Sequence, residues 1–252
     1  MSGHSKWSSI KHKKGVADQR RGKLFSKLSR AIIVAAREGG GDPASNLALQ
    51  NAIDKAREAS MPKDNIDRAI AKGAGTDSDS AAYETVVYEG YGPAGVAVIV
   101  EALTDNRNRT AGEVRHIFAK NDGNLGTSGA VAWLFERRGV VLVDAEGVDE
   151  DELTLAAADG GAEDVELDGS TFQITAEPEV LTSVREAVEA AGFTVENAEL
   201  TMVPKSTVEI DEEGTAKKIL RLIDALEEND DVQDVFANFD IPEAVLETAS
   251  AS

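Results

Sequence analysis

The hydrophobic pattern of this chain changes its period at one stretch, GAGTDSDSAA, which covers Gly73–Ala82. Before this stretch, apolar residues recur every three or four positions, which is typical of amphipathic helices. After it they alternate, which is typical of strands with one buried face. Gly, Ser and Asp without periodicity favour a linker. We therefore predict a helical N-terminal domain, residues 1–75, followed by a mixed α and β remainder.

Three helices are predicted before the linker. The first runs from Val16 to Arg37 and stops at three consecutive glycines. The second begins after a cap at Ser45 or Asn46, and the third is opened near Pro62 and closed by Gly73. These helices predict a small three-helix domain.

The third helix, Lys63–Lys72, is a candidate for reading DNA as part of a helix-turn-helix. Its cations are mixed with Asp64 and Asp67, and few of its side chains suit hydrogen bonding to base edges in a major groove. Three packed helices with a solvated outer face are the favoured interpretation.

Past the linker, residues 83–91 and 95–104 predict a β-hairpin, because the turn sequence GPA separates two alternating runs. A helix over 110–120 and a strand over 130–136 follow. After the break Arg137-Arg138-Gly139, residues 140–202 predict the order strand, helix, strand, strand, helix, strand. This βαββαβ order is the ferredoxin-like unit.

The C-terminal segments, a strand at 207–210, a helix at 212–228 and a strand at 232–239, cannot easily form a domain alone. Joined to the first strands after the linker, they complete a second α/β sandwich. The predicted fold class is α+β: a three-helix domain followed by two ferredoxin-like α/β domains, the second inserted into the first. The predicted boundaries are 1–75, 83–138 plus 205–241 for the discontinuous domain, and 139–204 for the insert.

Charged residues are also distributed unevenly along the chain. The first 37 residues hold ten Lys or Arg against one acid, Asp18, in a chain of net charge -20. Residues 1–75 carry a net +8 and the remainder a net -28. A basic arm on an acidic body confines polyanion contact to the arm, so nucleic acid is the expected partner. The alternative is a solvated tail without a ligand.

The candidate nucleic-acid contacts in this arm are cations with one interleaved aromatic. They are Lys6, Trp7, Lys11, His12, Lys13, Lys14, Arg20, Arg21, Lys23 and Lys27. The indole could stack on a base while the cations meet phosphates, or it could pack onto the protein as an anchor.

A second candidate contact lies at a predicted helix start in the acidic body. Arg107, Arg109 and Arg115 cluster there, where backbone N–H groups also favour an anion. In the alternative interpretation, Asn and Thr side chains cap the helix and the Arg side chains pair with neighbouring acids. The sequence leaves both open.

Signs of chemistry are sparse. The chain has no Cys, and its three His are scattered, so no zinc site, cofactor or catalytic constellation is expected. Gly123, Gly126 and Gly129 suit a turned loop better than a phosphate cradle. No apolar run approaches the roughly 20 residues that span a bilayer. We expect a non-enzymatic cytoplasmic protein with no membrane or small-molecule partner.

Five ordered motifs resemble the YebC/PmpR family, which includes the mitochondrial translational activator of cytochrome c oxidase. They are Gly3–Trp7 (GHSKW), Lys11–Lys14 (KHKK), Tyr88–Pro93 (YEGYGP), Thr104–Arg109 (TDNRNR) and Gly123–Gly126 (GNLG). The resemblance implies a cleft-shaped protein of three domains and a non-enzymatic regulator of gene expression.

Two functions follow from this resemblance. One is a DNA-binding transcriptional regulator, as bacterial members are usually described. The other is a ribosome-associated translation factor that contacts ribosomal RNA or tRNA and relieves stalling at consecutive prolines. A backbone-seeking arm suits the second, because ribosomal RNA is recognised largely by shape and phosphate contact. An acidic adaptor that binds proteins is a third hypothesis.

Overall fold

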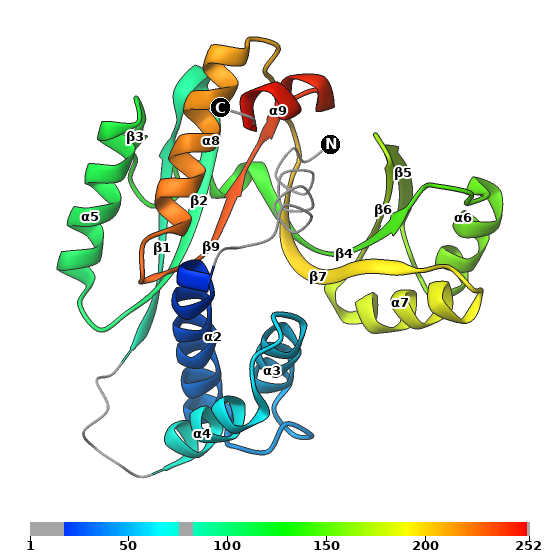
Figure 1. The fold of residues 1–252 in the computed structure, drawn as a ribbon, viewed down its shortest axis with the longest axis horizontal. Coiled ribbons are helices and arrows are strands. Elements are labelled where there is room, and N and C mark those ends of the chain that lie inside the picture. Colours follow the sequence, from blue (N-terminus) through cyan, green and yellow to red (C-terminus); the bar gives the residue numbers. More distant parts are fainter. Residues whose placement is uncertain (1–17, 76–82, 251–252) are drawn as a thin grey trace.

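The structure is a computed structural model that describes residues 18–75 and 83–250. It has the predicted α+β class, with three N-terminal helices and two four-stranded β-sheets that each carry helices on one face (Figure 1). Within these residues, no helix is both long enough and apolar enough to span a membrane.

The helical domain consists of α2 (Asp18–Gly39), α3 (Leu47–Glu58) and α4 (Lys63–Ala74). Asn46, one of the two predicted caps, caps α3 by accepting a hydrogen bond from the Leu49 N–H at 3.1 Å. Its amide also donates to the Ala35 carbonyl at 2.7 Å. One buried side chain thus caps α3 and fixes it to α2, so the turn between these two helices is held from inside.

Gly73 does not close the third helix. It lies inside α4, and a Cβ at this position would stand 2.4 Å from the Ile33 carbonyl oxygen of α2. The glycine is therefore explained by the close approach of two helices, which its lack of a side chain permits.

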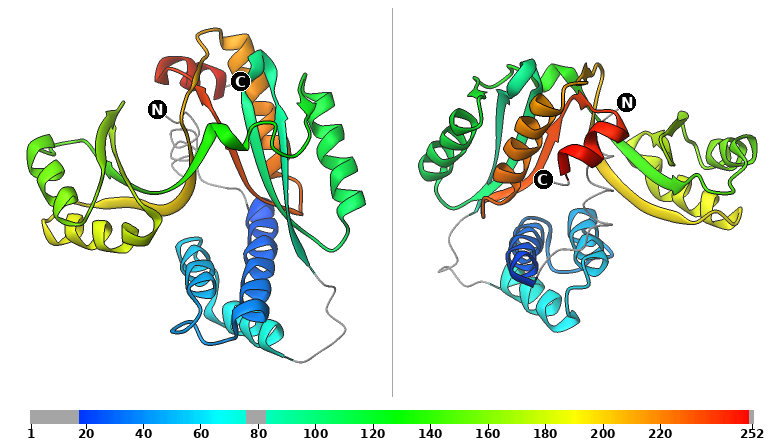
Figure 2. Two further views of the ribbon diagram at one scale, coloured as in Figure 1. Left: turned by 180° about the vertical axis from the view of Figure 1, so that it is seen from behind. Right: turned by 45° about the horizontal axis from the view of Figure 1, so that its top comes forward.

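The first sheet combines strands from both ends of residues 83–250. In spatial order its strands are β3 (Asn124–Leu125), β1 (Glu84–Tyr91), β2 (Ala97–Thr104) and β9 (Val232–Ala237), each antiparallel to its neighbour. Helices α5 (Arg107–Lys120) and α8 (Glu213–Glu227) cover one face (Figure 2). Phe118 and Ile223 from these helices pack with Val98 and Val100 of β2 in the core beneath.

The second sheet has the strand order of a ferredoxin-like fold. Its strands are β5 (Asp164–Asp168), β6 (Thr171–Ala176), β4 (Phe135–Asp144) and β7 (Val195–Pro204), again antiparallel throughout. Helices α6 (Glu150–Asp159) and α7 (Leu181–Ala190) pack on one face, where Leu153 and Val184 meet Val141 and Ile174 in the core. The connections alternate as β4-α6-β5-β6-α7-β7, which is the predicted βαββαβ order.

The predicted strand over 130–136 and the break after it were wrong. A 3₁₀ turn occupies Ala132–Leu134, and β4 then runs without interruption through Gly139. Pairing with β7 extends along β4 from Phe135 to Val143 and supports the strand across this glycine. A Cβ on Gly139 would lie 2.9 Å from the Leu181 Cβ, so the glycine is needed for packing against α7.

Two further differences lie at the C-terminal end. The predicted strand 232–239 is divided into β9 and β10 (Phe239–Asp240), and β10 pairs in parallel with β8 (Val208–Glu209). Helix α9 (Glu243–Ser250) was not predicted, although its Leu246 is fully buried in the core of the first sheet.

The two sheets are joined by apolar packing. Ala97, Ile99 and Phe236 on the first sheet contact Val131 and Phe135 at the entrance to the second. We propose the predicted division into domains, with residues 139–204 inserted into the domain formed by 83–138 and 205–241. The boundary at 138/139 falls inside β4, because this strand begins at Phe135 in the packing between the two sheets.

Candidate nucleic-acid interface

The predicted contact residues fall into three groups. Lys6, Trp7, Lys11, His12, Lys13 and Lys14 lie outside the described residues. Arg20 and Arg21 lie in the first turn of α2, and Lys23 and Lys27 follow on the same helix. Arg107, Arg109 and Arg115 all lie on α5.

Helix α2 meets the loop between α8 and β9 through its cations (Figure 1). Lys23 Nζ lies 3.9 Å from an Asp230 carboxylate oxygen, and Lys27 Nζ donates to the Glu227 carbonyl at the end of α8. Burial lowers the pKa of Lys27 to about 8, although the charges of Glu227 and Asp230 act to raise it. Two of the predicted nucleic-acid contacts therefore face the acidic body of this protein.

Asp231 is the centre of this junction. Its buried carboxylate accepts hydrogen bonds from Arg109 Nη2 at 2.7 Å, Thr110 Oγ1 at 2.7 Å and Arg30 Nη1 at 3.1 Å. Thr104 Oγ1 lies 3.3 Å away. Burial acts to raise the pKa of Asp231, but the hydrogen bonds from Arg109 and Thr110 and the nearby positive charges outweigh it, so the pKa lies below its usual value. The carboxylate thus links α2, α5 and β2.

A second ionic contact joins α3 to the first sheet. Lys55 Nζ lies 3.1 Å from Asp234 Oδ1 on β9, and the charge of Asp234 raises the pKa of Lys55. By contrast, the apolar cluster of the helical domain contains only residues of α2, α3, α4 and their connections. In the part of the chain that the structure describes, the helical domain is therefore attached by charge, and such contacts weaken as salt increases.

At the start of α5, the observed geometry matches the capping interpretation. Asn106 caps the helix by accepting from the Arg109 N–H at 3.1 Å. Arg109 also pairs with Asp105 at 3.0 Å, and Arg107 lies 3.6 Å from Glu84. The Arg side chains thus have acidic partners within the protein, and their contact with nucleic acid stays a proposal. Arg115 is exposed on α5.

A cavity of about 490 Å³ lies at the junction of α2, α5 and the loop after α8. Its lining has five carboxylates and two guanidinium groups: Arg30, Tyr83, Asp105, Arg109, Glu113, Glu228, Asn229, Asp230 and Asp231. The excess of acid makes this cavity unsuitable for a phosphate.

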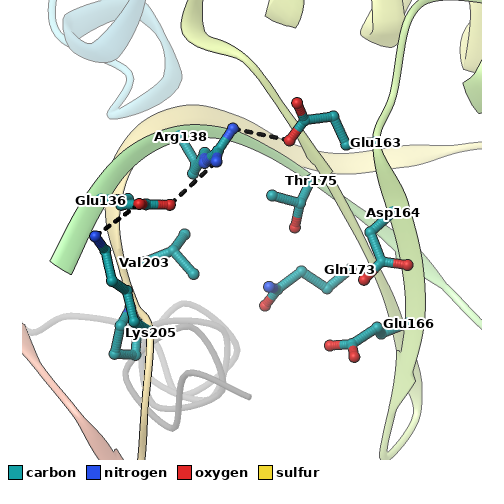
Figure 3. A pocket seen from close by; sticks show the side chains of 10 residues that line it. Glu136, Arg138, Glu163, Asp164, Glu166, Gln173, Thr175, Val203 and Lys205 are labelled. Atoms are coloured by element: carbon teal, nitrogen blue, oxygen red, sulfur yellow. Dashed lines mark hydrogen bonds and ion pairs between the residues drawn. The ribbon is translucent and has the colours of Figure 1, made fainter. Parts of the chain in front are cut away.

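A smaller cavity, of about 260 Å³, lies on the face of the second sheet that α6 and α7 leave open (Figure 3). Arg138 is held there by Glu136 at 3.1 Å, by Glu163 at 2.8 Å and by Glu177. Lys205 pairs with Glu136 at 2.7 Å. Its cations are already neutralised, so this cavity too has no positive charge to offer an anion. Residues 18–75 and 83–250 contain no group of three or more His, Asp or Glu that could hold a metal ion.

Sequence reasoning missed the acids that receive the helical domain. Asp231 and Asp234 stand in an acidic stretch after α8 that has no motif and no distinctive spacing. Arg30 was counted among the basic residues of the arm without a partner being identified. Only the approach of α2 to β9, about 200 residues apart in the sequence, brings these charges together, and no local signal could have predicted the pairing.

Comparisons with known proteins agree with this architecture over nearly the whole chain. Residues 5–76 match the family model described as the TACO1/YebC protein N-terminal domain. Residues 83–239 match the model described as the TACO1/YebC second and third domain. The gap between the two matches, residues 77–82, lies within the predicted linker.

Individual relatives are similar along their full length. A protein of Rubrobacter xylanophilus named "Probable transcriptional regulatory protein" is 61% identical, with 98% of each chain covered. One of the same name from Natranaerobius thermophilus is 54% identical, covering 98% of this chain and all of the relative. The crystal structure of a conserved hypothetical protein from Aquifex aeolicus matches with a TM-score of 0.78 at 54% identity, covering 90% of this chain and 93% of that one. From the domain models and these relatives together, the chain belongs to the TACO1/YebC family.

Proposed function

We propose that this protein is a non-enzymatic, cytoplasmic regulator of gene expression that binds nucleic acid. Duplex DNA is the proposed target, in line with the regulatory names of its relatives. The observation that carries the proposal is the division of charge: residues 1–75 hold 15 Lys or Arg against 7 acids, and the remainder holds 11 against 39. A polyanion is attracted to the first part and repelled by the second.

Some of the cations already have partners within the protein, and this reduces the set that we propose for phosphate contact. Lys23, Lys27, Arg30 and Lys55 already bind oxygens of the acidic body. We therefore assign the primary phosphate contacts to the cations that precede Lys23. Trp7 and His12 accompany them, and Arg107, Arg109 and Arg115 form a weaker second contact. The primary cations are Lys6, Lys11, Lys13, Lys14, Arg20 and Arg21.

The side chains of helix α4 are poorly suited to reading bases, which favours contact with the phosphate backbone as the mode of binding. Arg68, its central cation, donates to Asn65 and to the Asp64 carbonyl within its own helix. Asp64 and Asp67 are exposed on the same helix and would repel the phosphates that flank a groove. Affinity would then come from counterion release and fall steeply with salt.

The same observation favours a second candidate, a translation factor that contacts ribosomal RNA or tRNA on the ribosome and relieves stalling at consecutive prolines. Ribosomal RNA is recognised by shape and phosphate contact, which requires no groove-reading helix.

A direct competition separates the two candidates. Purified protein is mixed with ribosomes and an excess of promoter or mixed-sequence duplex DNA at physiological salt, and the mixture is sedimented. Retention on the ribosomes identifies a translation factor. Release into a DNA complex that survives nonspecific competitor identifies a DNA regulator. The matched control is a variant with Lys6, Lys11, Lys13 and Lys14 changed to Ala, which should bind both targets more weakly than the wild type. Full binding by this variant would remove the arm from the site.

A further inference from the structure

Two exposed aromatic side chains lie side by side where the two sheets meet. Tyr91 ends β1, and Trp133 lies in the 3₁₀ turn before β4. The Tyr91 hydroxyl donates to the Ala130 carbonyl oxygen at 3.1 Å, and the Trp133 indole N–H donates to the same oxygen at 3.2 Å. The two residues are nevertheless 38% and 66% exposed. Their polar groups are thus satisfied internally, and their apolar ring surfaces face solvent.

The loop that carries Trp133 is held rigidly. The buried Glu89 carboxylate accepts hydrogen bonds from the backbone N–H groups of Gly129, Val131 and Ala132, at 2.7, 2.8 and 2.7 Å. Gly129 has φ +85°, a conformation that glycine adopts without strain. Because the loop is fixed before any ligand arrives, little conformational entropy is lost on binding.

The pair lies on the face of the first sheet opposite α5 and α8. Tyr91 stands opposite Ala97 in the β1–β2 pairing, and Ala97 packs in the apolar cluster between the two sheets. Further along this face Glu101 stands opposite Asp234, which binds Lys55 of the helical domain. The aromatic pair is therefore on the face toward which the basic helical domain packs.

The segment that carries Trp133 has no charged side chain of its own, in an otherwise acidic body. Residues 123–135 form the longest run without Asp, Glu, Lys, Arg or His in the chain, and Trp133 lies within it. The adjoining Glu136 is paired with Arg138 and Lys205. Arg137 is exposed next to it. Trp133 therefore stands on an uncharged segment, and the nearby exposed cation Arg137 offsets part of the charge of Glu101 on the same face.

We propose that Trp133 and Tyr91 form a stacking platform for an unpaired base of the bound nucleic acid, with Arg137 next to its phosphate. This inference rests on the proposed nucleic-acid binding, and it favours a target with unpaired bases, such as the RNA of the second candidate, over continuous duplex DNA. Ring faces without hydrogen-bonding groups accept any base, which is how single-strand-binding proteins hold bases without reading sequence. Bases inside a duplex have no face available, so the platform selects single-stranded segments. A protein partner fits this patch less well, because two rings offer far less surface than the roughly 1,200 Å² that a stable protein interface buries.

The test uses Trp133 as its own reporter. Because the chain has two tryptophans, Trp7→Phe leaves Trp133 as the sole source of indole fluorescence. A single-stranded oligodeoxyadenylate of about 12 nucleotides, within the site size of single-strand binders, should quench this fluorescence, and the matching duplex should not. In the wild-type background, Trp133→Ala should weaken single-strand binding by about 5- to 100-fold and leave duplex binding unchanged. Trp133→Phe should restore most of the affinity.

The possible results distinguish failure of the stacking platform from failure of the proposed nucleic-acid binding. Single-strand binding with unchanged Trp133 fluorescence and an unaffected Trp133→Ala variant would overturn the platform and leave nucleic-acid binding intact. If the wild-type chain binds neither oligonucleotide at low salt, the proposed function fails as well. Fluorescence that changes with protein concentration alone, with self-association in sedimentation velocity, would assign the patch to a second copy of this chain and also overturn the platform. Circular dichroism of each variant checks its folding, which the exposed position of Trp133 should preserve.

Discussion

Replacing Asp231 tests whether one carboxylate holds the helical domain to the first sheet. Asp231→Ala removes the acceptor shared by Arg30, Arg109 and Thr110. Breaking a buried ion pair from one side costs about 3–5 kcal/mol. Two features reduce this cost: Arg109 is 45% exposed and keeps Asp105 as a partner, so solvent and that carboxylate compensate in part. We expect a loss of about 2–4 kcal/mol in the free energy of unfolding.

The assay is equilibrium urea unfolding at pH 7, followed by circular dichroism. Asp230→Asn is the matched control, because Asp230 is the neighbouring acid, is 66% exposed and meets Lys23 only at 3.9 Å. An exposed pair of this kind contributes at most about 1 kcal/mol. Equal losses for Asp231→Ala and Asp230→Asn would refute the central role of Asp231.

The pH dependence of stability gives a second test, with the variant Asp231→Asn. The pKa of Asp231 is lower in the folded protein than its ordinary value of 3.8. Its contribution to stability is therefore complete above about pH 4 and is lost as the pH falls through the folded pKa. The stability difference between the wild type and Asp231→Asn should be constant from pH 7 to 5 and shrink below pH 4. A difference that persists unchanged at pH 2 would contradict the ionic account.

Three further predictions address the fold and the arm. Gly73→Ala should destabilise the protein by at least about 1–3 kcal/mol, because its Cβ would stand 2.4 Å from a backbone oxygen of α2. The control is Gly112→Ala on the exposed face of α5, whose Cβ meets nothing within 4 Å; it should be neutral or stabilising in thermal unfolding. Changing the four arm lysines (Lys6, Lys11, Lys13 and Lys14) to Ala should flatten the dependence of log K for duplex DNA on log salt by up to about 3.6 without altering the melting temperature; an unchanged slope would exclude those lysines as contacts. A chain in which residues 139–204 are replaced by a short Gly/Ser linker should keep a cooperative urea transition, and its collapse to an unfolded chain would reject the proposed insertion.

The sequence alone determined which elements form and in what order, because both are local properties. Hydrophobic period distinguishes helix from strand wherever one face is buried, so the three N-terminal helices and the βαββαβ order were predictable. Asn46 was a predictable cap because its side chain reaches a backbone N–H three residues away. The division of charge at residue 75 likewise needed only the sequence.

Tertiary structure decided the features that depend on partners distant in the chain. Strand β4 continues through Gly139 because β7 pairs beside it and α7 packs above it, contacts that local propensity cannot contain. Asp231 became the attachment point of the helical domain only when folding placed Arg30 and Arg109 around it. The sequence showed that this chain separates positive from negative charge; only the fold showed that part of the positive charge is used to hold its own domains together.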